Sequence, residues 1–111
     1  MIGEEYNEKA QKIKVKMQEM IDAEYKYVDS RSEYIDSLIE RFGDSNDYMV
    51  ELLNLKKDNE DARAFLASLD NMLKNRLTAD GISRFNELLQ GYLNYSDVIG
   101  EDLGKFGGPA D

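Results

Sequence analysis

Two runs of residues at alternating spacings of four and three, one on each side of a glycine-containing bend, constrain the fold more than any other feature of this chain. The run after the bend keeps this alternation throughout and consists of Tyr48, Leu52, Leu55, Asn59, Ala62, Leu66, Leu69 and Leu73. The run before the bend reaches from Tyr6 to Phe42 and contains one stutter. Such spacing forms a stripe on an α-helix and is typical of helices that pack along a coiled-coil seam. The sequence therefore predicts two long helices, at about residues 4–41 and 46–77.

The bend at residues 43–45 predicts that the second helix folds back antiparallel on the first. Residues at equal distances from the bend then face each other, so that Phe42 meets Tyr48. Two polar residues of the seams, Ser32 and Asn59, fall opposite each other in this register. A buried polar layer of this kind fixes the register of two helices at some cost in stability. We therefore expect Ser32 and Asn59 to form one polar layer in the hairpin.

A third, shorter helix is predicted at about residues 80–98. Thr78 suits its N-cap, because a threonine hydroxyl accepts hydrogen bonds from the free backbone N–H groups of a first turn. The apolar stripe of this helix consists of Ile82, Phe85, Leu89 and Tyr92, widened by Leu88 and Leu93. We expect the stripe to cover two further rows at a spacing of seven residues, namely Tyr6, Ile13, Met20, Tyr27 and Tyr34 in the first helix and Phe65 and Met72 in the second.

The predicted fold is all-α: a long antiparallel helical hairpin, coiled-coil-like, with the third helix packed on the end distal to the bend. Residues 1–99 form one domain, of a length that suits a single core. Residues 100–111 contain four glycines and the one proline of the chain, and we expect a flexible or partner-ordered tail. The end of the hairpin near the bend is then expected to project as two helices without a third.

The composition offers little for catalysis or for a metal. Cysteine and histidine are absent, so the chain lacks thiolate nucleophiles, zinc–thiolate ligands and the commonest general base. The bend departs from a calcium loop starting at Asp44, because Tyr48, Met49 and Leu55 replace an oxygen ligand, the glycine and the bidentate glutamate. Clusters of acidic residues are expected on solvated helix faces. We therefore expect no catalytic residue, no cofactor, no metal and no enzyme activity.

Apolar residues near the bend are the first candidate for a partner-binding surface. Where the hairpin lacks a third helix, an apolar strip stays open and suits another copy or a helix of another protein. The strip and the two apolar residues of the tail are Tyr34, Leu38, Met49, Leu53, Leu103 and Phe106. The leading hypothesis is a non-enzymatic protein–protein interaction module: an adaptor, a chaperone, or a structural or accessory subunit of a larger assembly.

Acidic residues near the bend support an alternative. The formal net charge is −9, and residues 29–61 hold ten acidic groups against four basic ones. This charge disfavours direct binding to nucleic acid and favours a basic protein partner. The acidic tip comprises Asp36, Glu40, Asp44 and Asp47. The alternative function is an inhibitor that mimics DNA and occupies a basic groove on a nucleic-acid-handling or defence protein.

A hairpin of this size with the aromatic–glycine pair Phe42–Gly43 in its bend resembles small secreted helical-hairpin proteins that carry a Trp-X-Gly motif there. The chain departs from that motif, because tryptophan is absent and the aromatic residue directly precedes the glycine. The architecture also resembles small flagellar or type III export chaperones and phage accessory proteins. The charged start "MIGEEYNEKAQKIK" lacks the apolar stretch of a signal peptide, and no apolar run has the length of a membrane span. We expect a cytoplasmic protein, in the host cytoplasm if viral, that binds a protein partner or forms a homo-oligomer.

Overall fold

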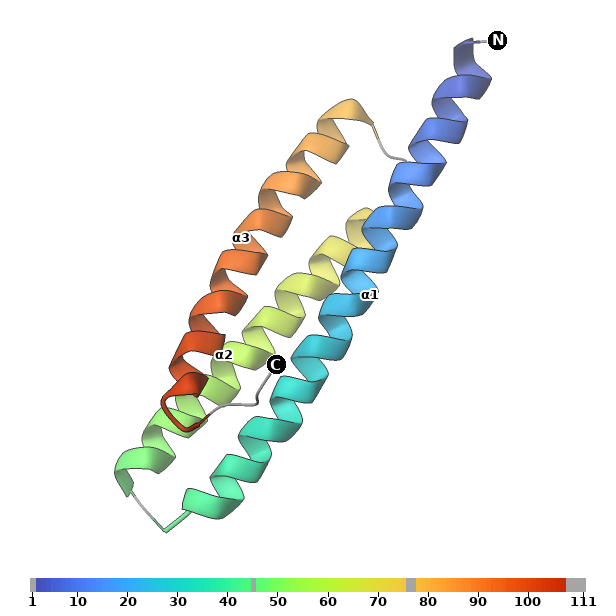
Figure 1. Ribbon diagram of the computed structural model, residues 1–111. Coiled ribbons are helices and arrows are strands. Elements are labelled where there is room, and N and C mark those ends of the chain that lie inside the picture. Colours follow the sequence, from blue (N-terminus) through green and yellow to red (C-terminus); the bar gives the residue numbers. More distant parts are fainter. Residues whose placement is uncertain (1, 45, 76–77, 108–111) are drawn as a thin grey trace.

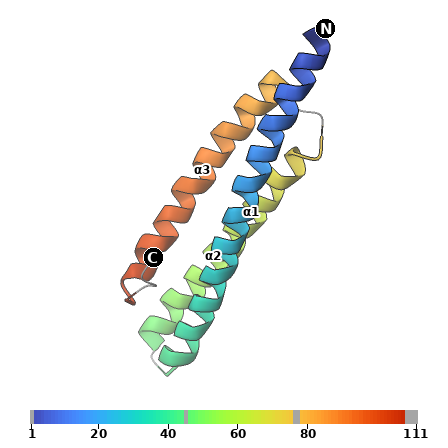
Figure 2. The same cartoon turned by 45° about the vertical axis from the view of Figure 1, so that its right-hand side comes forward.

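The computed structural model describes residues 2–44, 46–75 and 78–107, and the side chains of all of these except residues 2–7 and 46. The described residues form three helices: α1 (Ile2–Phe42), α2 (Asn46–Met72) and α3 (Ala79–Gly104). α2 runs antiparallel to α1, and α3 packs on α2 and returns in the direction of α1 (Figures 1 and 2). The molecule is elongated, with extents of 66, 21 and 18 Å. The all-α class, the hairpin and the shorter third helix are confirmed.

The hairpin is held together by the seam that the sequence predicts. The buried apolar residues of this seam are Met17, Ile21, Val28, Ile35, Leu52, Leu55, Ala62, Leu66, Leu69 and Leu73. Next to the bend, the rings of Phe42 and Tyr48 lie 5.5 Å apart. Far from the bend, Gln18 donates a 3.0 Å hydrogen bond to the carboxylate of Asp70. The predicted register is therefore confirmed over the length of the hairpin.

Gly43 makes space for the turn that follows α1. A Cβ atom at this position would lie 2.9 Å from the carbonyl oxygen of Ile39, closer than side chains approach a backbone oxygen. Gly43 does not have a positive φ, so the requirement is for close approach and not for a left-handed conformation. A larger residue here would therefore force the end of α1 to shift.

The connection between α2 and α3 is longer than predicted, because α2 ends at Met72 and not near residue 77. The N–H groups of Leu73 and Lys74 bond to carbonyls three residues earlier, which tightens the chain into a turn. Thr78 caps α3 as predicted: its hydroxyl accepts a 3.0 Å hydrogen bond from the N–H of Gly81.

α3 continues to Gly104, beyond the predicted end near residue 98. Its buried residues keep the four-three spacing to the end and are Phe85, Leu89, Tyr92, Ser96, Ile99 and Leu103. A glycine inside a helix costs about 1 kcal/mol relative to alanine. Full burial of one isoleucine or leucine side chain contributes about 1.5–3 kcal/mol. Burial of Ile99 and Leu103 therefore outweighs the cost of Gly100, and residues 100–104 are helix where a tail was predicted; residues 108–111 lie outside the described chain.

The bend end of the hairpin is covered by α3, and the expected two-helix projection is wrong. Phe106 follows α3 directly, and its ring lies 6.1 Å from that of Phe42 and 5.7 Å from that of Tyr48. At the opposite end of the molecule, the first turns of one helix lie beyond the ends of the other two. There the N-terminal part of α1 extends past both α2 and α3 (Figures 1 and 2).

Candidate protein-interaction surfaces

A buried polar layer joins the three helices. Arg31 Nε donates a 2.6 Å hydrogen bond to Asn59 Oδ1, and Asn59 Nδ2 donates a 3.1 Å bond to the carbonyl of Val28. Arg31 Nη1 donates to the hydroxyl of Ser96 at 2.8 Å and to its carbonyl at 3.0 Å. All three side chains are almost fully buried. The layer forms around Asn59 as predicted, but its partner from α1 is Arg31 and not Ser32.

The row of α1 that turns toward α3 differs from the predicted row. Three residues of the predicted row are exposed, namely Ile13, Met20 and Tyr27. The observed contacts come from Arg31, which bonds to Ser96, and from Glu24, whose charge acts on the Tyr92 phenol. Of the predicted row, Tyr27 still reaches α3, because its hydroxyl would lie 3.7 Å from a Cβ atom at Gly100. Because charged residues stand in the observed row, a search for apolar spacing does not find it.

Two buried polar atoms of this region, Arg31 Nη2 and Tyr92 Oη, have no hydrogen-bond partner among the described residues. Burial raises the pKa of the Tyr92 phenol to about 12, and the Glu24 carboxylate adds to the rise. The phenol is therefore protonated at neutral pH. It offers neither a base nor a nucleophile under these conditions. The polar layer specifies how the helices pack.

The apolar strip predicted near the bend is largely covered. Two of its residues are buried, Leu38 at 1% and Leu103 at 2% exposure. Three are partly buried, namely Tyr34, Met49 and Phe106. Leu53 is exposed, at 50%. The expectation of an open strip is therefore wrong for Leu38, and Tyr34 and Met49 are partly covered, because α3 and Phe106 reach this end of the hairpin. The two tail residues, Leu103 and Phe106, fold back onto the helices.

Exposed apolar residues lie instead on the outer face of α2. Val50 is 63% exposed and Leu53 is 50% exposed. The two side chains are neighbours, because residues three apart share one face of a helix. The sequence predicts Leu53 as a binding residue but not Val50, since an apolar residue outside the seam gives no periodic signal. We call Val50 and Leu53 the α2 patch.

The predicted acidic tip lies at the bend end and is mostly unpaired. Asp36 forms an ion pair with Lys56, with 3.0 Å between Asp36 Oδ1 and Lys56 Nζ. The hydrogen bond to Asp36 raises the pKa of Lys56. The three other carboxylates are exposed and form no ion pair with a described residue; they are Glu40, Asp44 and Asp47. The structure therefore brings the four predicted residues to one end and leaves three of them open to solvent.

The end of α3 adds charged groups to the acidic tip. Lys105 Nζ lies 3.9 Å from Glu51 of α2 and 3.8 Å from Asp102 of α3. One lysine thus lies between two carboxylates, which leaves the bend end acidic. Surface pairs at these distances add little stability, so they do not close this surface to a partner.

The N-terminal part of α1 packs little against the other helices, and its first turns extend past both α2 and α3 (Figures 1 and 2). We call residues 2–16 the α1 overhang, because Met17 is the first buried residue among the described side chains of α1, which begin at Glu8. None of the described side chains from Glu8 to Lys16 is buried. The overhang is about 22 Å long at the 1.5 Å rise of an α-helix. Ile13 and Val15 are 38% and 48% exposed on it.

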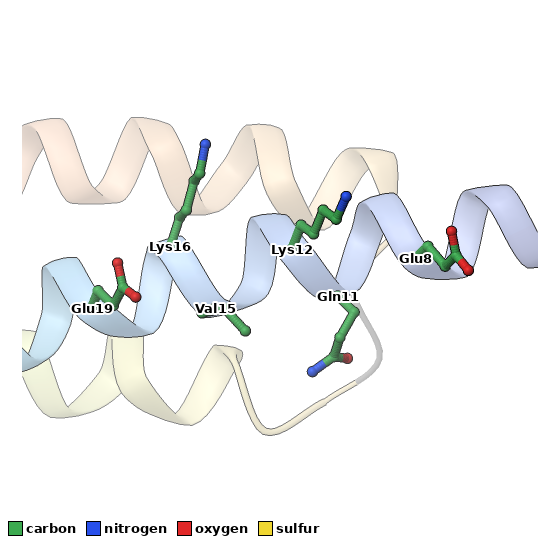
Figure 3. Close-up of a pocket in the computed structure, with 6 residues that line it drawn as sticks. All are labelled: Glu8, Gln11, Lys12, Val15, Lys16 and Glu19. Carbon is green, nitrogen blue, oxygen red and sulfur yellow. The ribbon is translucent and has the colours of Figure 1, made fainter.

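The lysines of the α1 overhang are concentrated in its second half, after three glutamates at positions 4, 5 and 8. Residues 9–18 contain Lys9, Lys12, Lys14 and Lys16 and no acidic residue. None of these lysines forms an ion pair with a described residue. An open groove of about 560 Å³ follows this part of α1 and is lined by Glu8, Gln11, Lys12, Val15, Lys16 and Glu19. Figure 3 shows Lys12 and Lys16 on one side of the helix and Gln11 and Val15 on the other.

Within residues 2–44, 46–75 and 78–107, no cluster of three or more histidine, cysteine, aspartate or glutamate side chains is arranged to hold a metal ion. None of the described helices combines the length and the apolar composition needed to cross a membrane. No protein-family model, curated protein or solved structure matches the chain. The surfaces described above are therefore the basis for assigning a function.

Proposed function

We propose that the protein is a non-enzymatic protein–protein interaction module that binds through the α1 overhang. The observation that carries this proposal is a helical segment in which no described side chain is buried. A helix of this length is marginal in water, because nucleation is costly and helix propensity contributes little. A partner that covers Val15 would stabilise it, as when one face of a helix lies in the groove of a binding protein.

The α2 patch gives the molecule a second apolar surface at the other end. Val50 and Leu53 lie within two turns of the start of α2, whereas the overhang lies at the distal end of the 66 Å molecule. Two separated surfaces allow contact with two neighbours. This arrangement supports an adaptor, a chaperone or an accessory subunit of a larger assembly, with phage-encoded and secretion-related assemblies as the candidates.

The chemistry of the chain supports binding over catalysis. Carboxylate catalysis requires two carboxylates in a shaped cleft, whereas Glu40, Asp44 and Asp47 stand on an exposed surface. The chain contains neither histidine nor cysteine. A sequence without cysteine also suits a reducing compartment, and we place the proposed role in the cytoplasm.

Site-specific photo-crosslinking in the native cell tests this function. A photoreactive amino acid in place of Val15 is expected to label one partner protein. The matched control is Val98 of α3, which has similar exposure (54% against 48%) but lies outside the overhang. The purified partner should bind with a Kd of about 1 μM or below, and Val15→Glu should weaken binding at least about tenfold. Equal labelling at both positions, or an unchanged Kd, would contradict the proposal.

A second candidate, the DNA-mimicking inhibitor, is supported by the exposed carboxylates of the acidic tip. In this function a partner crosslinks at Asp44, and its affinity falls steeply with salt. Replacement of Asp36, Glu40, Asp44 and Asp47 by lysine is expected to abolish binding. The chain should also compete with duplex DNA for the purified partner; binding without competition would exclude this function.

A further inference from the structure

We propose that the partner of the α1 overhang is the bend end of a second copy of this chain, in a symmetric antiparallel dimer. The inference rests on the proposed interaction function and names its partner. Two elongated molecules lie side by side in opposite directions. Each overhang then meets the acidic tip and the α2 patch of the other copy.

Charge complementarity between the two ends is the first support. The α1 overhang carries three glutamates before residue 9, followed by four lysines and no acidic residue in residues 9–16, whereas residues 36–51 carry five acidic residues and one arginine. The exposed groups are Lys9, Lys12 and Lys16 at one end and Glu40, Asp44 and Asp47 at the other. Opposite charges at the two ends favour an antiparallel neighbour and oppose a parallel one.

Exposed apolar residues accompany the charge at both ends. Ile13 and Val15 are 38% and 48% exposed on the overhang, and Val50 and Leu53 are 63% and 50% exposed near the bend. Surface ion pairs alone add little affinity, so a stable contact needs apolar surface at its centre. Both ends of the molecule supply such surface together with charge of opposite sign.

Symmetry favours the closed arrangement. A single contact between an overhang and a bend end leaves one free overhang and one free bend end, and its repetition produces an open filament. A twofold axis lets the same contact form twice within one pair and closes the dimer. The elongated shape, with an extent of 66 Å, places these two contacts at opposite ends of the pair.

The net charge of −9 opposes association, but salt limits this repulsion. At about 0.15 M salt the Debye length is about 8 Å, which is short compared with the 66 Å molecule. Repulsion between distant carboxylates is then screened, whereas lysine–carboxylate contacts act over a few ångströms. The dimer is therefore expected at moderate salt and should weaken near 1 M, where the Debye length is about 3 Å.

Charge reversal at each end, followed by analytical ultracentrifugation, tests the dimer. The overhang variant is Lys12→Glu/Lys16→Glu, and the tip variant is Asp44→Lys/Asp47→Lys. Each variant alone should raise the dimer Kd at least about tenfold. An equimolar mixture of the two should restore dimers to about the wild-type Kd, because each altered end then meets an opposite charge. The matched control, Lys26→Glu/Arg63→Glu, reverses two exposed basic residues in the middle of the hairpin, outside both ends, and should change the Kd by less than about threefold.

Single cysteines test the direction of packing, because the chain has no cysteine of its own. Copies carrying Lys12→Cys and copies carrying Asp47→Cys, mixed and oxidised, should form mainly the mixed disulfide. A predominance of disulfides between two Lys12→Cys copies would show overhang against overhang and overturn the antiparallel arrangement.

Other results also overturn the dimer. One is a chain that stays monomeric in ultracentrifugation at about 1 mM. Another is a dimer Kd that neither charge-reversal variant changes. A third is a monomer whose overhang lysines bind duplex RNA. The proposed function is judged separately, by photo-crosslinking at Val15. Crosslinking to a different protein would leave that function standing without the dimer, whereas a monomer with no crosslinked partner would contradict both.

Discussion

We call the three-helix body the part of α1 from Met17 onward together with α2 and α3. The body and the α1 overhang share one seam pattern, but only the body buries it. Ile21 and Val28 of the body are fully buried, whereas Ile13 in the overhang is 38% exposed. The spacing of α1 is helical in both regions. The difference comes from the neighbours, because α2 ends at Met72 and α3 begins at Ala79. A heptad seam thus shows which side chains a helix can bury, and the length of the neighbouring helices decides which ones it does bury.

A pair of isoleucine truncations tests this comparison most strongly. Ile21→Ala should lower the free energy of unfolding by about 4 kcal/mol, because it leaves a cavity in the closed core. Ile13→Ala removes the same atoms from the same helix, and should change the free energy of unfolding by less than about 0.5 kcal/mol. Urea unfolding followed by circular dichroism measures both. Equal losses would show that the overhang is packed like the body.

Truncation at the bend end asks whether α3 belongs to the body over its whole length. Leu103→Ala should cost about 3 kcal/mol in the free energy of unfolding, since Leu103 is 2% exposed. The control is Val98→Ala on the exposed face of the same helix, for which we expect less than about 0.5 kcal/mol. A negligible loss at Leu103 would mean that the end of α3 behaves as a tail in solution.

The polar layer distinguishes the body from the overhang in a second way. Arg31→Ala should lower the free energy of unfolding by about 2 kcal/mol, because it leaves the buried amide of Asn59 and the hydroxyl of Ser96 without their partner. Ser32→Ala is the control, and an effect of less than about 0.5 kcal/mol is expected. A larger loss at Ser32 than at Arg31 would restore the layer that the sequence predicts.

Tyr92→Phe should have the smallest effect, an increase of about 1 kcal/mol in the free energy of unfolding, because it removes a buried hydroxyl without a hydrogen-bond partner. The pKa of this phenol is raised from 10.0 to about 12 in the folded state. The unfolded chain therefore loses this proton more readily than the folded one, so the wild type keeps its stability below pH 10 and loses some of it as the pH rises to about 12. Between these values Tyr92→Phe should lose less stability than the wild type. Tyr27→Phe, at an exposed tyrosine, should follow the wild-type profile.

Spacing is sufficient to predict the hairpin and its register, because two continuous stripes and the position of the bend fix which residues face each other. The Thr78 cap is predictable because it depends on residues within one turn. The end of α3 was also present in the sequence. The four-three spacing of α3 continues through Ser96, Ile99 and Leu103. Gly100 obscures this continuation, because a glycine at this point is typical of a helix end. The energetic comparison of one glycine with two buried side chains gives the correct end.

Other features could not be read from spacing. Arg31 is buried although its charge predicts a solvent-exposed position. Its hydrogen bonds to Asn59 and Ser96 explain this burial. The lysines of the overhang are not evident from the net charge of the N-terminal region, since residues 1–28 together contain five basic and six acidic groups. The exposure of the overhang depends on where α2 ends. α2 ends at Met72, and no proline or glycine near this residue indicates a helix end in the sequence.

Amide hydrogen exchange at several protein concentrations tests the central claim most directly. In dilute solution, the amides of residues 8–13 should exchange at least about a hundredfold faster than those of residues 21–35, because they open locally without breaking the core. At concentrations where the chain associates, exchange in residues 8–13 should slow at least about tenfold, with matching protection in residues 44–53. Equal protection of the overhang and the body at every concentration would contradict the account.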